Sequence, residues 1–502
     1  MPRSPRPANR ARSAYRAAIL SEPSCRAGAP GVTSSSTTGH HLVVRARPMS
    51  HSCPRARVLL AALCLCWAGL PLRAEPAVTS RHVVLISVDG LRPEFYLDPA
   101  WPAPHLQALA RRGLAAEGVE GVFPTLTYPS HTTLITGVRP ARHGILYNTR
   151  FDPAGDAARW FQQADEVRAA GLKSASVNWP ITSGAAIDFN LPETFSYDTP
   201  EDRRPAISAA ATPPRLFEEV QREATGRLSA RDVFYKDPAV DRNNARALAY
   251  LIRTYRPHLA AIHLVYADAA QHEHGRDGEA VRQAVADIDA AVAVILEAVE
   301  QAGLSARTTV IVTGDHGFVG THTAIAPNVW LRGAGLLGTG DAERGEGWRA
   351  IFHSGGGSTF LQLREPGDQA TLRQVRALLA ALPPGTQRLL HVVEQPALRA
   401  AGADPRAALA LVAEPGLAFV SASRGEPLRP QRGGAHGYGP ELREVRTGFV
   451  AAGAGLGSAG SIPLLHLEDV APTVAALLGL TLPEAQGVAL PGVVAAPAAR
   501  AR

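Results

Sequence analysis

Several carboxylate and imidazole side chains stand at positions where they could bind metal ions. Most of them directly follow apolar segments, and in a parallel sheet such positions lie at the edge where ligands bind. Taken singly, an Asp after a strand is more often a turn former or a helix cap than a ligand. Carboxylates combined with imidazoles suit zinc, so the group as a whole predicts a metal site. Its members are Asp89, Asp268, His272, Asp315, His316 and His436.

Asp268 and His272 are four residues apart. If Asp268 opens a helix, both side chains project from one face toward the same point. This is a spacing that metal ligands use, although His274 is an alternative to His272. The pair therefore predicts half of a binding site and leaves its second member open.

Two further histidines lie in turns. His316 directly follows Asp315 and precedes Gly317, so neighbouring side chains can diverge toward two different ions. His436 lies in the glycine-rich stretch 433–439, where glycines let the backbone approach a site closely. On local sequence alone, both histidines are explained equally well as loop residues and as ligands.

Thr127 has the sequence surroundings of a nucleophile. Pro129 indicates that a helix begins here, which places Thr127 at the positive end of the helix dipole. That end favours both an alkoxide and a phosphate group. A lone threonine at such a place is more simply interpreted as an N-cap, so the prediction depends on the other residues of the group.

Three apolar segments must position these side chains. Each contains an apolar run of the kind found in a fully buried parallel strand, and a polar residue follows the segment closely. Between the second and the third segment, apolar residues repeat at helical spacing from 278 to 301. Strand, helix and strand in this order predict an α/β fold with a doubly wound sheet. The three segments are His82–Val88, Leu259–Val265 and Thr308–Thr313.

The sequence changes character at residues 330–430. Glycines occur in succession at 355–357, a helix rich in Ala and Leu is predicted near 372–382, and Pro-Gly turns surround it. We expect an inserted subdomain here. The segment 465–480 has apolar residues at helical spacing and is expected to pack on the sheet without a chemical role.

The N-terminal part of the chain is typical of an export signal. Residues 49–74 combine basic residues, an apolar run and a small-residue ending. Because the run is shorter than the about 20 residues that span a bilayer, cleavage is favoured over a membrane anchor. Residues 1–48 are expected to be a disordered extension, or untranslated if the protein starts at Met49. This leaves 75–502 as the mature, periplasmic or secreted domain.

Composition excludes some classes of function. All four cysteines lie before residue 75, so the mature domain has no thiol for a zinc finger or a cysteine nucleophile. The formal net charge of +6 is largely carried by the same N-terminal region. The charge therefore does not indicate nucleic-acid binding.

The order and context of these residues resemble the nucleotide pyrophosphatase/phosphodiesterase family of the alkaline phosphatase superfamily. The resemblance extends over most of the chain after the signal. It implies an alkaline phosphatase-like three-layer sandwich with a largely parallel central sheet and an inserted α+β subdomain. It also implies a hydrolase that cleaves phosphodiester or pyrophosphate bonds of nucleotides or related compounds. The matching residues are Asp89, Thr127, Asp268-x-x-x-His272, Asp315-His316 and His436.

The same resemblance implies two zinc ions and a covalent intermediate. Thr127 would attack phosphorus and form a phosphothreonine. Asn148 matches the asparagine with which the family donates a hydrogen bond to a non-bridging phosphate oxygen. The implied ligands are Asp89, Thr127, Asp315 and His316 for one ion, and Asp268, His272 and His436 for the other.

The resemblance favours phosphodiesters over phosphomonoesters. Thr-dependent monoesterases of the superfamily pair their asparagine with a Lys and an Arg, and the corresponding stretch 177–182 has neither. Trp160, Phe161 and Trp179 could stack on a nucleobase, although large aromatic side chains are more often part of the core. We expect a small phosphodiester or nucleotide substrate and no nucleic-acid partner, and the oligomeric state stays open.

Some alternatives share the same ligands. Leu126 and Ser130 stand where the family often has Lys and Asn, so a phosphomonoesterase or a phosphonate hydrolase stays open. An alternative of another class is a non-catalytic periplasmic binding protein that keeps the metals for structure. The presence of both Thr127 and Asn148 argues against that alternative.

Overall fold

An eight-stranded sheet forms the centre of the part of the chain that this computed structural model describes, residues 81–149, 171–194, 201–338 and 348–493. The five neighbouring strands from β7 to β5 run parallel, whereas β17 is antiparallel to both of its neighbours. The predicted α/β fold with a largely parallel sheet is therefore confirmed. The strand order is β18 (Gly460–Ile462), β2 (Leu114–Ala116), β17 (Phe449–Gly453), β7 (Thr308–Thr313), β1 (His82–Val88), β6 (Leu259–Leu264), β4 (Ser174–Val177) and β5 (Phe189–Leu191).

Strand β1 lies among the parallel strands and is buried along its whole length. Val84 and Ile86 pack into one core cluster, while Val83 and Leu85 pack into another on the opposite face. A strand covered on both faces must be apolar on both, which explains its apolar run from Val83 to Ile86. Its register with β6 and β7 brings the C-terminal ends of three strands to one edge of the sheet.

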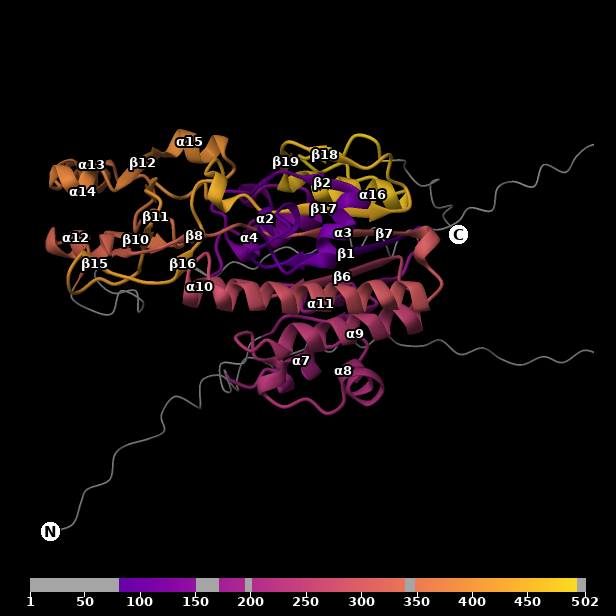
Figure 1. The fold of residues 1–502 in the computed structure, drawn as a ribbon. Helices are drawn as coiled ribbons and strands as arrows, with labels where there is room; N and C mark the ends of the chain where they lie inside the picture. The colour runs from indigo at the N-terminus through magenta and orange to yellow at the C-terminus, as the bar shows by residue number, and fades with distance from the viewer. Residues whose placement is uncertain (1–80, 150–170, 195–200, 339–347, 494–502) are drawn as a thin grey trace, which may run out of the picture. The chain divides into compact units, whose positions relative to one another are not determined.

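Helices cover both faces of the sheet (Figure 1). The helices α9 (Ala239–Tyr255) and α11 (Glu279–Gln301) pack on one face together with α3 (Pro104–Arg112). On the other face lie α4 (Thr127–Thr136) and α16 (Val470–Leu478). The result is the three-layer arrangement that the sequence resemblance implies.

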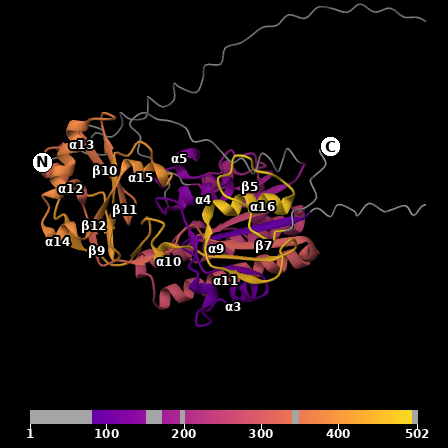
Figure 2. The same cartoon turned by 90° about the horizontal axis from the view of Figure 1, so that it is seen from above.

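A second sheet belongs to an α+β subdomain that is inserted after β7, and Figure 2 shows it grouped beside the main layers. Its strands are antiparallel, and it has a core cluster of its own. Helices α12 (Pro327–Gly333) and α13 (Gln369–Ala380) contribute to that cluster. In sheet order its strands are β10 (Ala350–Ser354), β11 (Ser358–Leu363), β13 (Leu409–Ala413) and β12 (Leu390–Glu394).

Short elements connect these parts. Those of the main layers are α2 (Glu94–Leu97), β3 (Val119–Glu120), α5 (Pro140–His143), α7 (Arg204–Ala210), α8 (Leu216–Val220), α10 (Tyr266–His274) and β19 (Leu465–His466). Those in and around the subdomain are β8 (Val319–Gly320), β9 (Thr323–Ile325), α14 (Pro384–Gln387), α15 (Gln395–Ala400), β14 (Leu417–Phe419), β15 (Leu428–Pro430) and β16 (Gly434–Ala435). Single turns of 3-10 or π helix are η1 (Gln221–Thr225), η2 (Arg231–Val233), η3 (Ser305–Arg307), η5 (Arg443–Val445) and η6 (Leu467–Asp469).

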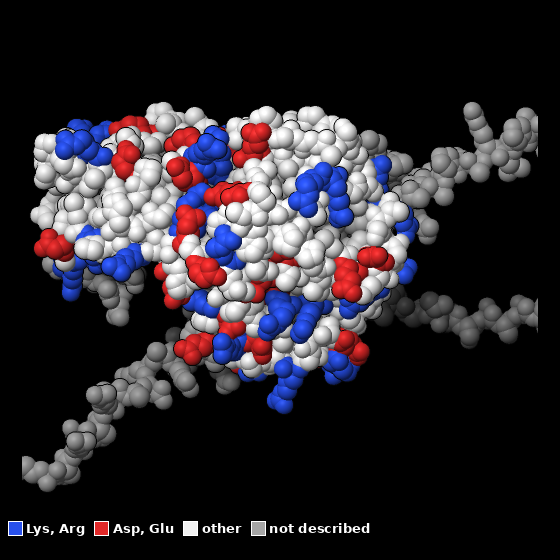
Figure 3. Space-filling view, viewed as in Figure 1, with Lys and Arg blue, Asp and Glu red and all other residues white. Residues whose placement is uncertain are grey.

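On the face seen in Figure 3, basic and acidic side chains are interspersed. Among the described helices, none is both long enough and apolar enough to cross a membrane. The expected extension 1–48, the expected signal 49–74 and the aromatic residues Trp160 and Phe161 lie outside the described residues.

Candidate active site

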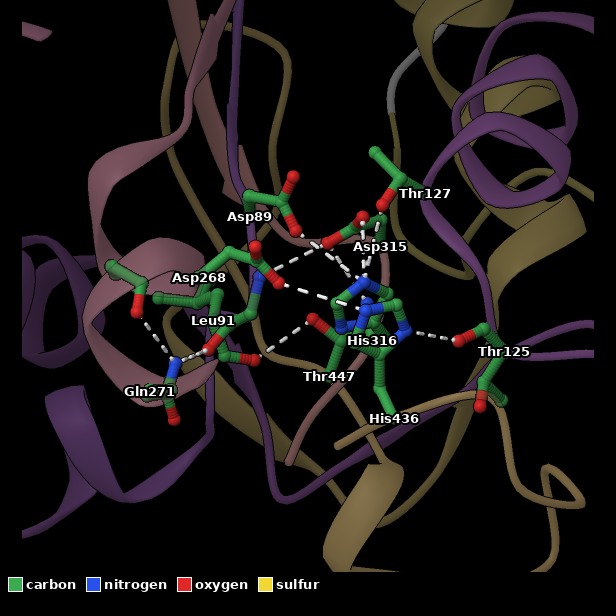
Figure 4. Close-up of polar contacts among 12 residues, drawn as sticks. Asp89, Leu91, Thr125, Thr127, Asp268, Gln271, Asp315, His316, His436 and Thr447 are labelled. Carbon is green, nitrogen blue, oxygen red and sulfur yellow. Dashed lines mark hydrogen bonds and ion pairs between the residues drawn. The ribbon is translucent and has the colours of Figure 1, made fainter. Parts of the chain in front are cut away.

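Three aspartates meet at the carboxyl edge of the parallel strands (Figure 4). Asp89 follows β1 and Asp315 closely follows β7, and these two strands are neighbours in the sheet. Asp268 lies in the first turn of α10, which follows β6 on the other side of β1. Because parallel strands end at the same edge, residues that are far apart in the sequence meet there.

Among the described residues, this convergence produces two groups of ligand-type side chains, and His316 belongs to both. The ligand atoms within each group lie within 4.8 Å of one another. His272 Nε2 lies beside the second group, 3.4 Å from Asp268 Oδ1. All six predicted ligands are thus brought together, although the sequence prediction assigns His316 to one ion only. The groups are Asp89, Asp315 and His316, and Asp268, His316 and His436.

The three histidines share one orientation. In each, Nδ1 bonds a backbone carbonyl, which can only accept, so Nδ1 carries the proton. The lone pair on Nε2 is then directed toward the aspartates. Histidines that bind metals almost always donate their other ring N–H in this way. The bonds run from His272 to Gly434 (2.9 Å), from His436 to Thr125 (2.9 Å) and from His316 to Gly317 (3.2 Å).

The aspartates carry oxygen atoms that the protein does not satisfy. Asp89 Oδ1, Asp268 Oδ1 and Asp315 Oδ2 are buried and receive no hydrogen bond from the described residues. Buried polar atoms in native structures almost always have a partner. Three such oxygens beside three imidazole lone pairs form a donor set that fits divalent metal ions such as zinc.

The protonation equilibria of the site agree with this donor set. Burial raises the pKa of Asp89 well above its ordinary value, and the negative charges of Asp268 and Asp315 add to the effect. Burial also raises the pKa of Asp315 to about 7 and lowers the pKa of His436 to about 4. The imidazole of His436 is therefore neutral at pH 7 and able to act as a ligand, and a bound cation would relieve the repulsion among the carboxylates.

Thr127 is the first residue of α4, and Leu126 holds the N-cap position. The alternative interpretation of Thr127 as an N-cap is therefore wrong. Its Oγ1 lies 3.5 Å from His316 Nε2, beside the buried carboxylates. The positive end of α4 thus faces a place where a phosphate group can bind.

Asn148 lies against the same hydroxyl. Its Oδ1 accepts a hydrogen bond from Tyr128 N at 2.8 Å, and its Nδ2 donates to Thr127 Oγ1 at 3.3 Å. The backbone N–H can only donate, so it determines which end of the amide faces Thr127. The amide therefore presents an N–H donor next to the candidate nucleophile.

Two buried histidines that the sequence analysis did not select support the site from behind. His131 bonds the Thr127 carbonyl through Nδ1 at 2.8 Å and Ser87 Oγ through Nε2 at 2.9 Å. His263 Nε2 lies 3.1 Å from Asp89 Oδ2. His263 is the only polar residue in the segment Leu259–Val265, and His131 follows Thr127 by one helical turn. Both histidines could therefore have been selected from the sequence.

A cavity of about 210 Å³ opens beside these residues. His272, His436 and Asn148 line it from the main layers, and His353 and Ser354 line it from the subdomain. A larger hollow of about 730 Å³ lies at the opposite edge of the sheet, where β7 begins. The smaller cavity is therefore the one that lies beside the Asn148 amide and the clustered carboxylate and imidazole side chains.

The two remaining sequence candidates lie elsewhere. Trp179 is 1% exposed and packs in the core, with its ring edge-on to that of His131 at 5.2 Å. A ring without an exposed face cannot stack on a substrate, so in this structure Trp179 is a core residue. His274, the alternative to His272, is exposed at the end of α10 and belongs to neither group of ligands.

Comparison with known families identifies one match that spans most of the domain. The family model described as type I phosphodiesterase / nucleotide pyrophosphatase matches residues 83–439. Among curated relatives, mouse ectonucleotide pyrophosphatase/phosphodiesterase family member 3 is 26% identical over 269 residues, which are 50% of this chain and 26% of the relative. Bis(5'-adenosyl)-triphosphatase from Xenopus laevis is 30% identical over 127 residues, 23% of this chain and 27% of the relative. The chain thus spans about a quarter of the length of these relatives.

Solved structures show the same fold. Murine ectonucleotide pyrophosphatase/phosphodiesterase 5, solved as an inactive threonine-to-alanine variant in complex with AMP, superimposes with a TM-score of 0.59 at 19% identity. The human protein of the same name superimposes with a TM-score of 0.58 at 20% identity. Each match covers 81% of this chain and 97% of the other.

Proposed function

Because the chain belongs to the type I phosphodiesterase / nucleotide pyrophosphatase family, we propose that it is a metal-dependent hydrolase of phosphodiester or pyrophosphate bonds in nucleotides or related compounds. One observation carries the proposal. The Thr127 hydroxyl lies at the N-terminus of α4, 3.3 Å from Asn148 Nδ2 and 3.5 Å from His316 Nε2. A nucleophile, an anion-binding helix end and a hydrogen-bond donor are thus combined at one point.

Two zinc ions complete the proposed site. Their support is the donor set of unsatisfied carboxylate oxygens and inward-facing imidazoles. Bound ions would supply positive charge that lowers the pKa of the Thr127 hydroxyl and offsets the charge of the phosphate. The proposed ligands are Asp89, Thr127, Asp315 and His316 for one ion, and Asp268, His272 and His436 for the other.

In the proposed reaction, Thr127 Oγ1 attacks phosphorus and the bond to the leaving group breaks. The product of this step is a phosphothreonine ester, which a water molecule then hydrolyses to restore Thr127. Asn148 Nδ2 donates a hydrogen bond to a non-bridging oxygen, whose charge grows in the transition state. The N-terminus of α4 holds the same group through its dipole.

The proposed substrate is a diester rather than a monoester. A diester carries one negative charge fewer and therefore needs fewer cationic partners. Among the described residues that line the 210 Å³ cavity, those that are not proposed ligands carry no charge at pH 7, and this includes His353, whose pKa is lowered by burial. A phosphomonoesterase or phosphonate hydrolase is the alternative, and it would use the same ligands.

We further propose that the protein acts outside the cytoplasm, in the periplasm or as a secreted enzyme. The support is the export-type sequence of residues 49–74. A small phosphodiester or nucleotide is the proposed partner, in keeping with a cavity of about 210 Å³.

The decisive experiment compares initial rates of the zinc-loaded protein on bis(p-nitrophenyl) phosphate and on p-nitrophenyl phosphate. Thr127→Ala should abolish turnover of the diester. Thr132→Ala is the matched control, because Thr132 lies on the same helix and its hydroxyl donates to the Tyr128 carbonyl at 2.8 Å, away from the candidate ligands. Preference for the monoester would make the protein a phosphatase, and activity that survives in Thr127→Ala would show that another group is the nucleophile.

A further inference from the structure

Tyr147, the residue before Asn148, is buried between the main layers and the inserted subdomain. Its ring packs in an apolar cluster with Phe123 and Leu126, which precede Thr127, and with Leu398 and Phe360 of the subdomain. The rings of Tyr147 and Phe360 are 5.2 Å apart. The cluster therefore joins the two loops that carry Thr127 and Asn148 to the subdomain.

The hydroxyl of Tyr147 reaches a buried carboxylate of the subdomain. It donates a hydrogen bond of 2.8 Å to Asp404 Oδ2, and the Asp404 residue has no exposed surface. The same oxygen accepts a bond from Gln362 Nε2 at 3.1 Å, and Oδ1 accepts one from Arg406 N at 2.9 Å. Burial and the charge of Asp404 raise the pKa of Tyr147 well above its ordinary value, so the phenol stays a donor. Both carboxylate oxygens of Asp404 are thus fixed by hydrogen bonds, so Asp404 offers the Tyr147 hydroxyl an acceptor at a defined position.

A second contact with the subdomain lies on the other side of Asn148. Thr149 Oγ1 lies 3.3 Å from His353 Nε2, and the His353 ring packs edge-on against Tyr147 at 4.6 Å. Asn148 is therefore flanked by residues that are tied to the subdomain. Its own side chain points the other way, to Tyr128 N and Thr127 Oγ1.

We propose that Asp404 is a positioning residue which, through its hydrogen bond with Tyr147, holds the Asn148 amide at the distance from Thr127 that the reaction requires. The inserted subdomain thereby takes part in the reaction without touching phosphorus. This inference rests on the proposed function, because it assigns a role to the amide donor named there. A donor that is displaced by a fraction of a bond length stabilises the transition state less, so the subdomain acts on kcat.

A double-mutant cycle tests this coupling. Tyr147→Phe removes only the hydroxyl and should lower kcat for bis(p-nitrophenyl) phosphate about tenfold while changing KM little. In the Asn148→Ala background the same substitution should have almost no effect, because the group that it positions is absent. Equal losses in the two backgrounds would mean that Tyr147 acts on general stability, and the inference would be wrong. Tyr250→Phe is the matched control, because it removes a hydroxyl that bonds Glu219 at 2.8 Å, far from the site.

Hydrogen–deuterium exchange tests the same inference without substrate. The Tyr128 N–H donates a hydrogen bond to Asn148 Oδ1, so we expect this bond to slow its exchange. Tyr147→Phe should speed its exchange toward the rate in Asn148→Ala, and Tyr250→Phe should leave it unchanged. Asp404→Asn, which keeps the size of the side chain, should shift the exchange in the same direction and serves if Tyr147→Phe does not fold.

The two experiments separate the inference from the proposed function. If the protein hydrolyses no diester, or if Asn148→Ala leaves kcat unchanged, the proposed function fails and amide exchange alone decides the positioning role. Unchanged exchange of the Tyr128 amide in both Tyr147→Phe and Asp404→Asn would overturn the inference.

Discussion

His436 Nε2 lies 3.2 Å from His272 Nε2, although the two residues are 164 positions apart in the chain. In both side chains a backbone carbonyl holds the proton on Nδ1, so two nitrogen lone pairs face each other. Lone pairs at this distance repel unless a cation or a proton lies between them. The geometry of the pair therefore suits a metal ion bound between the two nitrogen atoms.

His436→Ala is expected to remove one of the two proposed zinc ions. The loss of a direct ligand should weaken that ion's affinity by more than the about 10- to 100-fold lost when an outer hydrogen-bond partner is removed. Zinc content after dialysis, measured by mass spectrometry, should fall from two ions to one per chain. His274→Ala removes an exposed histidine of α10 and should leave both ions in place. Retention of both ions by His436→Ala would contradict the ligand assignment.

Asn148→Ala is expected to lower kcat by about 100- to 1,000-fold, the cost of removing one donor to a developing oxyanion. KM for bis(p-nitrophenyl) phosphate should change much less, because the bond strengthens in the transition state. The zinc content should stay at the wild-type value, because Asn148 is not a proposed ligand. Its side chain forms hydrogen bonds with Tyr128 N and Thr127 Oγ1. A rise in KM without a fall in kcat would instead indicate that Asn148 serves only to bind substrate.

Gly437→Ala is expected to destabilise the fold around His436. A Cβ at this position would lie 1.7 Å from the Gly355 carbonyl oxygen, and the backbone has a φ of +82°. Gly144 is the matched control, because its φ is +83° and a Cβ there would meet nothing within 4 Å. Gly144→Ala should therefore show only the left-handed backbone cost of about 1–2 kcal/mol. Gly437→Ala should lower the free energy of unfolding by clearly more in urea denaturation, and equal losses would show that the loop adjusts freely.

Asp241 is expected to make the stability of the protein depend on pH. Its carboxylate accepts bonds from Val265 N and Tyr266 N at the start of α10, but burial outweighs them and raises its pKa to about 7. The folded protein therefore binds a proton between about pH 4 and 7 that the unfolded chain has released. The contribution of Asp241 to stability is greatest below about pH 4 and is lost as the pH rises to 7.

Urea denaturation at several pH values in the presence of a chelator measures this effect. Relative to Asp241→Asn, the wild-type free energy of unfolding should fall by about 1–3 kcal/mol between pH 4.5 and 7.5. The chelator removes metal from both proteins, so that metal loss does not enter the difference. A difference that is independent of pH would mean that Asp241 is ionised throughout.

The sequence predicts the central strands well, and it selects candidate ligands that the fold brings together, because their signals are local. The segment Thr308–Thr313 consists of β-branched residues around an apolar centre, and the structure has a strand with the same bounds. The spacing of Asp268 and His272 predicts that they share one face of a helix, and in the structure His272 Nε2 lies 3.4 Å from Asp268 Oδ1. Such features need no knowledge of the rest of the fold.

The contacts that the sequence does not predict are long-range. Tyr147 and Asp404 are 257 positions apart, and in the sequence Asp404 is an ordinary turn residue before a proline. Trp179 is a second example, because the sequence does not tell whether a large aromatic side chain near candidate site residues points into the site or into the core. Its burial in the core depends on packing that only the assembled layers determine.

The hydrogen bond from His436 to the Thr125 carbonyl spans 311 positions of the chain. A chain that has been synthesised only as far as α11 already contains Thr127, Asp268 and His272. It still lacks His316 and His436, the two imidazoles of the second group. The centre is therefore assembled late, when β16 reaches the sheet edge and its loop meets the nucleophile's own loop. If the proposed metal ions bind at this centre, retention of metal would report that the whole chain has folded, and a chain cut short before β16 would carry Thr127 without the complete group of ligands.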